Sequence, residues 1–408
     1  MAPRDTYLGD MGFLDFDSGG GALLPVRGAR GTDAVLRWSD RRTWHGRLPS
    51  ASDVVRVPAG STLLIDTNIA VAAIIVLGTL EFAACNLNVR TAGLLVLGDG
   101  RVRAGTAEQP FTHRLVVTLI ESGEHSLVDG LGSRFIAAIG GGTIELYGPR
   151  RMSWSMLGDT VFPGGVVVRL AEPVDWRAGE HIVVASGGAD LPLVEERAVA
   201  AIANDRRRIT LDRPLCHRHL GRTAPVAGSS PQSIGKVALL SRDIVIEGDD
   251  ASCAASQGAH CLISARLPGE ATASARHAVG RFSGVEFRRV GQFNMPGRYP
   301  LHWLANGESA DNALLDCSVH DSYQRGVVVT NTHGVRMQGN VVYRPLGHGF
   351  VVEHADDGAA LLATNLAIRP RVVRYADPAM RSLGEHNPRA VWAAQAVQPR
   401  TVGQVAIR

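Results

Sequence analysis

The chain has 408 residues, of which 42 are basic and 39 acidic, so its formal net charge is +3. This length can bury at least one large core, and it favours two all-β units over one compact domain. The charges form no block of like sign, so we expect no nucleic-acid partner. The small positive excess gives slight support to an anionic polysaccharide as the ligand.

No segment of the sequence is long and apolar enough to cross a membrane. The longest apolar run, residues 69–77, is followed by Gly78, whereas a bilayer requires about 20 residues. The first thirty residues contain four aspartates and lack the basic start and apolar run of a secretory signal. We therefore expect no membrane span and find no visible signal peptide. The 46 glycines, together with frequent arginine and alanine, favour a bacterial source.

Short β-branched runs separated by turn residues dominate the sequence from Trp38 onward, and none has helical spacing. From Gly280 these runs repeat. Ser318, Asn340 and Asn365 follow one another at intervals of 22 and 25 positions, within the range of about 20 to 50 that marks repeat architectures. Each repeat is expected to form one coil, and stacked parallel coils bury their interior.

We therefore predict an all-β protein in which a glycine-rich all-β domain precedes a right-handed parallel β-helix, a solenoid of the pectate-lyase type. The predicted division is a flexible lead-in at 1–35, the glycine-rich domain at 36–165, the β-helix at 166–370 and a C-terminal tail or cap at 371–408. We expect a monomer.

The five cysteines form no C-x-x-C pair. Two interpretations stay open for them: a disulfide between Cys253 and Cys261, or isolated buried thiols.

The N-terminal part contains several short motifs. In chain order they are Trp44, Val57-Pro-Ala-Gly60, Ile65-Asp66, Gly98-Asp-Gly100 and Gly105-Thr-Ala-Glu-Gln-Pro-Phe111. Further motifs continue that order: Asp175-Trp-Arg-Ala-Gly179, Glu195-Glu196, His219-Leu-Gly221, Tyr299-Pro-Leu-His302, Asp316-Cys-Ser-Val-His320, Leu346-Gly-His348 and Glu353. Together they resemble the family of the cell-migration-inducing and transmembrane hyaluronidases, in which an eight-glycine domain precedes a parallel β-helix. The resemblance covers nearly the whole chain.

The resemblance implies a secreted or surface-facing protein that hydrolyses hyaluronan or a related glycosaminoglycan. Three positions depart from it, because Leu304, Asp321 and Thr330 stand where the relatives carry histidine or another polar residue. Two alternatives therefore stay open. The first is a non-catalytic glycan-binding or adhesion module, and the second is a polysaccharide lyase with an arginine or histidine base.

Polar residues cluster between positions 286 and 357, where the interior of a β-helix requires aliphatic side chains. Glycosidic cleavage uses a carboxylic acid and a second carboxylate, and histidine sometimes takes one role. Arginine can bind a uronate through two parallel hydrogen bonds, and an aromatic ring can stack on a sugar. The predicted catalytic residues are Glu353, His302, His348, His320 and Asp316, with Glu286 or Asp321 as further carboxylate partners. The predicted substrate-binding residues are Arg325, Arg288, Trp303 and Glu286. A structural role at the coil turns is the competing interpretation for each.

No cofactor is firmly indicated. Asp249-Asp250 and Asp356-Asp357 are candidate calcium sites. For Gly98-Asp-Gly100, a hairpin turn is a better interpretation than a phosphate or calcium site. Zinc is a weak candidate at Cys216-His217-Arg218-His219. Trp154 and Trp176 fit either sugar stacking or the core.

Overall fold

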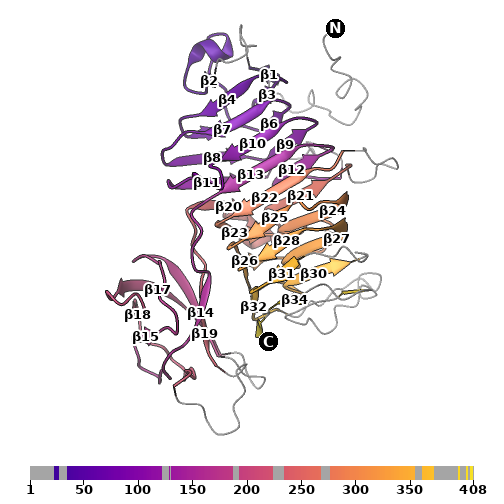
Figure 1. The fold of residues 1–408 in the computed structure, drawn as a ribbon. Coiled ribbons are helices and arrows are strands. Elements are labelled where there is room, and N and C mark those ends of the chain that lie inside the picture. Colours follow the sequence, from indigo (N-terminus) through magenta and orange to yellow (C-terminus); the bar gives the residue numbers. More distant parts are fainter. Residues whose placement is uncertain are drawn as a thin grey trace.

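The computed structural model describes residues 23–26, 35–121, 128, 130–186, 193–223, 234–267, 276–353, 361–371, 394–395, 401–402 and 405–407. Over these residues the chain winds into a right-handed parallel β-helix (Figure 1). Successive coils contribute strands to three long parallel sheets, which we call sheets A, B and C. The predicted fold class is confirmed.

Sheet A consists of β1 (Leu23–Pro25), β3 (Val54–Val57), β6 (Ala73–Val76), β9 (Gly93–Leu97), β12 (Phe135–Ile139), β21 (His260–Ser264), β24 (Leu301–Glu308), β27 (Val327–His333), β30 (Phe350–Glu353) and β33 (Ala394–Gln395). Sheet B consists of β2 (Val35–Arg37), β4 (Thr62–Ile65), β7 (Thr79–Phe82), β10 (Arg101–Ala104), β13 (Thr143–Tyr147), β22 (Val279–Ser283), β25 (Ala313–Leu315), β28 (Arg336–Gln338), β31 (Leu361–Ala363) and β34 (Thr401–Val402). Sheet C consists of β5 (Ile69–Ala70), β8 (Leu87–Thr91), β11 (Leu115–Leu119), β20 (Ile244–Gly248), β23 (Val285–Val290), β26 (Ser318–Ser322), β29 (Val341–Tyr343), β32 (Leu366–Ile368) and β35 (Val405–Ile407).

Two short helices lie among the described residues, η1 (Arg41–Trp44) and α2 (Ala251–Ala255). Neither these nor any other helix in the described ranges has the length and apolar character of a membrane span.

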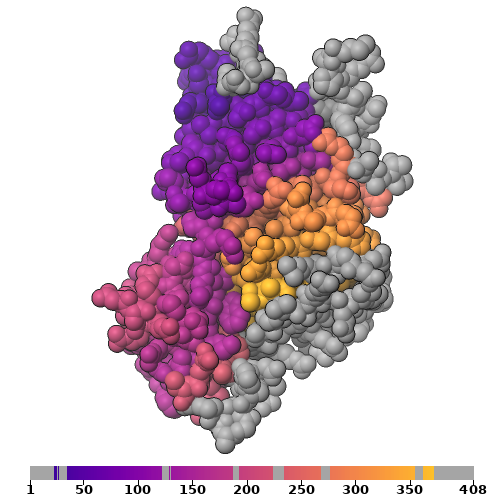
Figure 2. Space-filling model, in the orientation of Figure 1, coloured from indigo at the N-terminus to yellow at the C-terminus, as the bar shows by residue number. Residues whose placement is uncertain are grey.

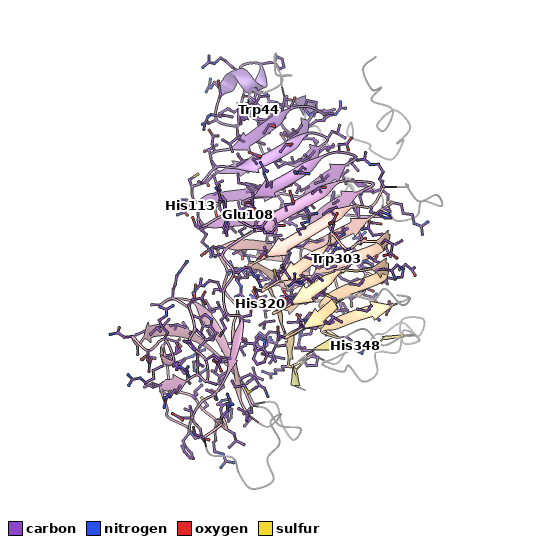
Figure 3. All side chains as sticks on the ribbon, viewed as in Figure 1. Trp44, Glu108, His113, Trp303, His320 and His348 are labelled. Atoms are coloured by element: carbon purple, nitrogen blue, oxygen red, sulfur yellow. The ribbon has the colours of Figure 1, made fainter. Side chains whose placement is uncertain are left out.

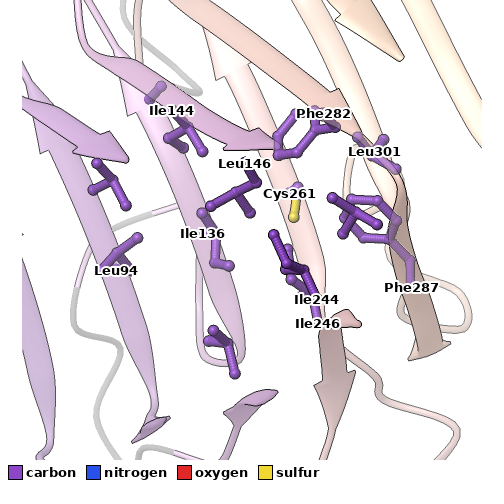
Figure 4. Close-up of a cluster of buried hydrophobic side chains, with 14 of the residues drawn as sticks. Leu94, Ile136, Ile144, Leu146, Ile244, Ile246, Cys261, Phe282, Phe287 and Leu301 are labelled. Carbon is purple, nitrogen blue, oxygen red and sulfur yellow. The ribbon is translucent and has the colours of Figure 1, made fainter. Parts of the chain in front are cut away.

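The interior of the solenoid is filled by apolar side chains from all three sheets. Successive residues of a strand point to opposite faces, so every second residue faces inward. In β24, for example, Leu301 and Trp303 belong to the core, and His302 between them faces outward. Figure 4 shows part of this core, with Phe282, Phe287 and Leu301 packed among the aliphatic side chains. Outward positions are thereby left to carry polar groups.

Buried asparagines organise the corner between sheets B and C. The Asn340 amide donates to the Leu314 carbonyl, and its oxygen accepts from the Cys317 backbone N–H. Asn365 occupies the same position one coil later and accepts from the Asn340 backbone N–H. The register pairs Ser318 with Val341, one residue later than the sequence repeat had aligned it, because Asn340 lies in the corner and not in the strand.

A separate antiparallel sheet interrupts the solenoid between β13 and β20 (Figure 1). We call residues 154–239 the inserted sheet. Its strands are β14 (Trp154–Met156), β15 (Val167–Arg169), β16 (His181–Ala185), β17 (Val194–Ile202), β18 (Arg208–Leu211) and β19 (Lys236–Leu239). It has its own core around Trp176. A second apolar cluster, which includes Tyr343 and Ile368, joins it to the outer face of sheet C. Figure 2 shows the inserted sheet packed against the solenoid.

The structure differs from the predicted division at two places. The strands from residue 54 to 147 share sheets A, B and C with the later coils, so the glycine-rich stretch is the beginning of the same solenoid. The inserted sheet occupies much of the range 166–245, which the sequence analysis had assigned to the β-helix. The second difference arises because short parallel and antiparallel strands have the same local pattern.

Candidate functional site

The predicted site residues divide between two outer faces of the solenoid, because sheets A and C face different directions. His302, Arg325, His348 and Glu353 lie on or beside sheet A. Glu286, Arg288 and His320 lie on sheet C. In Figure 3, His320 is on the side that faces the inserted sheet, well apart from His348. One groove therefore does not contain all of them.

Strand register brings the sheet A residues together. His302 in β24 pairs with Val328 in β27, which in turn pairs with Val351 in β30. Two residues further along, Thr330 in β27 pairs with Glu353 in β30. These positions alternate with the inward core residues, so their side chains share the outer face of sheet A.

We define the sheet A cluster as Tyr299, His302, Arg325, Thr330 and Glu353. The His302 ring contacts three neighbours: Nδ1 lies 3.1 Å from the Gly297 carbonyl oxygen, Nε2 lies 3.3 Å from Thr330 Oγ1, and the Tyr299 ring packs edge-on at 4.9 Å. Arg325 Nη1 donates to Glu353 Oε1 at 3.0 Å, and its guanidinium lies 5.7 Å from the centre of the Tyr299 ring. The five side chains form one continuous network.

The protonation of His302 follows from its partners. Burial lowers the pKa of His302 to about 4, an effect that the Gly297 carbonyl opposes and the charge of Arg325 reinforces. The ring is therefore neutral at pH 7. A carbonyl can only accept, so Nδ1 carries the hydrogen and Nε2 accepts from the Thr330 hydroxyl. His302 is thus a fixed, uncharged member of the cluster.

The side chains of the sheet A cluster differ in solvent exposure. The Glu353 side chain is 27 % exposed, whereas His302 and Arg325 are nearly buried. Of the two charged members, Glu353 is accordingly the one that a ligand reaches first. His348 lies one coil beyond Arg325 and two residues before the start of β30, as the sequence had predicted.

The sheet C residues form an ion-pair network. His320 Nε2 lies 3.2 Å from Glu286 Oε1, and its Nδ1 lies 2.9 Å from Asp321 Oδ2. Burial opposes the charge on His320, but the two carboxylates outweigh it and raise the pKa of His320 to about 9. Arg288 pairs with Glu247 and Glu286 in the same network. Each charge has an opposite partner, which is the arrangement that buried charges require.

This network extends to the inserted sheet. Arg344 lies 3.6 Å from Asp321 and 3.2 Å from Glu196 of β17, and Tyr343 donates to the same Glu196 carboxylate at 2.7 Å. The sheet C residues therefore join the inserted sheet to the solenoid. Three of the predicted site residues, Glu286, Arg288 and His320, thus lie on a different sheet from Glu353.

Asp316 is a corner residue between β25 and β26. Its backbone is left-handed, with φ at 52°, and its carboxylate accepts from Arg150 Nε at 2.6 Å. Arg150 precedes the inserted sheet, so this ion pair ties the entry of the inserted sheet to the corner. Burial raises the pKa of Asp316, and Arg150 opposes that shift. The geometry gives Asp316 an anchoring role, away from the sheet A cluster.

Trp303 is fully buried inside the solenoid (Figure 3). Its ring packs edge-on against Phe282 at 6.3 Å, and its Nε1 donates to Asn312 Oδ1 at 2.9 Å. It cannot stack on a sugar, so the prediction of a sugar platform there is wrong. The error arose because successive side chains of a strand point to opposite faces. His302 faces outward, so Trp303 must face inward. Trp176 is likewise buried, in the core of the inserted sheet.

Two members of the cluster were missed by sequence reasoning. Tyr299 stands three positions before His302 in the matched motif Tyr299-Pro-Leu-His302, and that proximity was the available signal. Thr330 was read as a departure from the family, yet its hydroxyl contacts His302.

The metal and thiol candidates have other roles in the structure. All five cysteines are free, and Cys261 is buried while Cys253 is exposed. Within the described ranges, no three His, Cys, Asp or Glu side chains are placed to hold a metal. Asp249 pairs with Arg134 and accepts from Ser252, and Asp99 pairs with Arg276. Asp356 and Asp357 lie outside the described residues.

Comparison with known proteins agrees with this architecture. Residues 43–158 match the model of the G8 domain, and residues 269–401 match the model of the CEMIP beta-helix. The chain is thus a parallel β-helix protein that carries these two domains, and the family resemblance drawn from the sequence is confirmed.

Among known proteins the chain is homologous to Fibrocystin-L. It is 28 % identical to Fibrocystin-L of Mus musculus over 371 residues, which cover 81 % of this chain and 9 % of that protein. It is 30 % identical to a G8 domain-containing protein of Dictyostelium discoideum over 350 residues, which cover 82 % of this chain and 29 % of that protein. The chain therefore spans less than a third of the length of these relatives.

Two solved structures are matched with TM-scores well below 0.5. The tailspike gp61 of Pseudomonas phage phi297 gives a TM-score of 0.23 at 10 % identity, covering 69 % of this chain and 50 % of that chain. The gp54 tailspike of Acinetobacter baumannii phage AP22, solved with a capsular saccharide, gives 0.20 at 10 % identity, covering 72 % and 53 %.

Proposed function

We propose that this chain binds an anionic polysaccharide on the outer face of sheet A and hydrolyses bonds within the polymer. The leading substrate is a hyaluronan-like glycosaminoglycan, and the reaction takes place outside the cell. The observation that carries the proposal is the sheet A cluster itself. It combines a partly exposed carboxylate, a guanidinium and a neutral histidine within one network of hydrogen bonds and contacts with the Tyr299 ring.

The Arg325–Glu353 pair couples binding to chemistry. A uronate carboxylate resembles Glu353, so it can compete for the guanidinium through two parallel hydrogen bonds. Binding of the polymer would then release Glu353 from Arg325 beside the glycosidic bond. A freed carboxyl group can act in the proton transfer or the nucleophilic step of glycoside hydrolysis. His302 would hold Thr330, the neighbour of Glu353, in a fixed orientation.

The test uses the purified chain with hyaluronan, chondroitin and a bacterial uronate polymer, each with and without calcium. Chain length is followed by size-exclusion chromatography, and unsaturated products by ultraviolet absorbance. Glu353→Gln should lower the cleavage rate by about 10²-fold or more, as expected for loss of a proton-transfer group. Glu308→Gln, an exposed glutamate of the same strand as His302, is the control and should cleave normally. Equal rates in the two variants would exclude Glu353 from the chemistry.

A second candidate function is glycan binding without cleavage. One specific observation favours it: Glu286 and Asp316 lie elsewhere, so Glu353 is the one carboxylate in the sheet A cluster. Binding without chain shortening would identify this function. Shortening with new ultraviolet absorbance would instead indicate a lyase that uses His302 or Arg325.

A further inference from the structure

A second polar network lies within the inserted sheet, remote from the sheet A cluster in the fold. Ser186 follows directly after β16, Glu195 is in β17, and His219 forms an isolated bridge with Val161. Ser186 Oγ lies 3.0 Å from His219 Nδ1, and His219 Nε2 lies 3.0 Å from Glu195 Oε1. A hydroxyl, an imidazole and a carboxylate are thus connected in series.

The carboxylate end of this series is firmly fixed. Glu195 accepts backbone N–H bonds from Cys216 at 2.8 Å and from His217 at 3.0 Å, and it also pairs with Arg197. Burial alone would raise the pKa of Glu195, but these bonds, the His219 contact and the charge of Arg197 lower it to about 2. Glu195 is therefore ionised throughout the physiological range, and an ionised carboxylate only accepts hydrogen bonds.

The ionised carboxylate determines the tautomer of His219. Because Glu195 can only accept, His219 Nε2 must carry a hydrogen. Burial lowers the pKa of His219, against the effect of Glu195, so the ring is neutral. Nδ1 then has a free electron pair directed at the Ser186 hydroxyl. This is the hydrogen-bond order of an activated serine nucleophile, in which a carboxylate orients the base that takes the serine proton.

Burial is graded along the series. His219 is completely buried and Glu195 nearly so, whereas Ser186 is half-buried at the end of its strand. The hydroxyl is therefore the accessible group, and the base and its orienting carboxylate are shielded from water. An open hollow lies at the carboxylate end of the series and is lined by Glu195, Arg197, Cys216 and His217.

We infer that Ser186, His219 and Glu195 form a catalytic site for the hydrolysis of small carboxylic esters, such as acetyl esters. The inference does not depend on the proposed function of the sheet A cluster, since the two groups share no residue.

The reaction is an acyl transfer followed by hydrolysis. Ser186 Oγ bonds to the acyl carbon while its proton moves to His219 Nδ1. The bond from the acyl carbon to the alcohol oxygen breaks, and the departing alcohol takes the proton from His219. Water then attacks the acyl-serine with His219 again as the base, releasing the carboxylic acid and restoring the Ser186 hydroxyl. Glu195 stays ionised and stabilises the imidazolium that forms at each stage.

The test uses the purified full chain, a fluorophosphonate probe and 4-nitrophenyl acetate. We expect one adduct, located on Ser186 by peptide mass spectrometry, and ester turnover. Ser186→Ala should lower both labelling and turnover at least tenfold. Ser241→Ala is the matched control, because Ser241 is also half-buried but its hydroxyl oxygen accepts from the His181 backbone N–H. This variant should react as the parent does.

A second variant tests the role of Glu195 and leaves Ser186 unchanged. Glu195→Gln nearly preserves the size of the side chain but removes the charge that directs His219, so labelling should fall tenfold while circular dichroism stays unchanged. Absence of an adduct on Ser186 in the folded parent chain, or labelling that persists in Ser186→Ala, would overturn the inference. Polysaccharide cleavage should be the same in the parent and in Ser186→Ala, which separates this outcome from that of the proposed function.

Discussion

Arg325 and Glu353 meet across two coils of the solenoid, with Arg325 Nη1 3.0 Å from Glu353 Oε1. The guanidinium comes from the residues just before β27 and the carboxylate from the end of β30. Arg325 is nearly buried and Glu353 is the more accessible partner. A charged ligand that reaches this pair therefore meets the carboxylate first and must displace it to reach the guanidinium.

Arg325→Ala should weaken binding of a uronate polymer by about tenfold or more, because a hydrogen bond to a charged group contributes about 1.5–3 kcal/mol. Binding of an uncharged glucan should not change. Arg325→Lys should be intermediate, since an ammonium lacks the planar fork of arginine. Isothermal titration calorimetry measures all three affinities.

Arg288→Ala is the control for this prediction, because Arg288 pairs with Glu247 and Glu286 on sheet C. It should bind the polymer as the parent chain does. If Arg288→Ala loses binding and Arg325→Ala keeps it, the ligand lies on sheet C instead.

His320 should stabilise the fold in a pH-dependent manner. Its folded pKa of about 9 exceeds its ordinary value of 6.5, so the folded state holds the proton more tightly. The stabilisation is therefore fully present below pH 6.5 and is lost as the pH rises through 9, with a maximum of about 3 kcal/mol. Urea unfolding at pH 6, 7.5 and 9 should show the parent losing stability over this range.

His320→Gln removes the titrating group, so its stability should change less between pH 6.5 and 9 than that of the parent. Glu286, Asp321, Arg288 and Arg344 surround the site and keep their charges over this range. Identical pH dependence in the two chains would show that His320 is not held as a cation.

Asp316 should tolerate asparagine. Asparagine adopts the left-handed backbone that φ of 52° requires, and the Arg150 side chain is 55 % exposed, so the ion pair contributes less than about 1 kcal/mol. Asp316→Asn should therefore keep polysaccharide cleavage within a factor of two. Asp316→Val should lose about 1–3 kcal/mol, because a branched side chain is strained in this conformation. A hundredfold loss of cleavage in a folded Asp316→Asn chain would restore a catalytic role.

Trp303→Ala should destabilise the chain by about 3–5 kcal/mol, the usual cost of removing a buried aromatic ring. Trp303→Phe should cost less, because it retains an aromatic ring that can pack on Phe282. Denaturant midpoints measure both variants. Polymer affinity should be unchanged wherever the variants are folded, and a folded Trp303→Phe chain without affinity would indicate that the ring contacts the sugar.

The sequence predicted the solenoid because its period of short strands and turns is regular. It also predicted that His302 falls in line with Val328 and Val351, since register follows from the repeat. The sequence did not show which predicted site residues lie on sheet A and which on sheet C. The repeat period assigns a residue to a coil, but it does not give the direction in which the side chain points. His320 and His302 therefore looked like neighbours, although they lie on different sheets.

The inserted sheet escaped detection for a related reason. Most of its strands are as short as those of the solenoid, and two of its pairings, β14 with β19 and β15 with β18, join strands that are distant in sequence. The Ser186–His219–Glu195 series was equally hidden, because its members lie 33 and 24 positions apart in sequence.

The ladder of sheet C runs past the inserted sheet without a break, since Leu115 of β11 pairs directly with Ile244 of β20. A later coil closes the same corner with only Asp316 and Cys317 between its strands. The connection at this corner can thus be two residues or a whole sheet without a change in the pairing of the coils. Any module exchanged for the inserted sheet would have to cover the apolar residues of sheet C, Tyr343 and Ile368 among them, that the inserted sheet now buries.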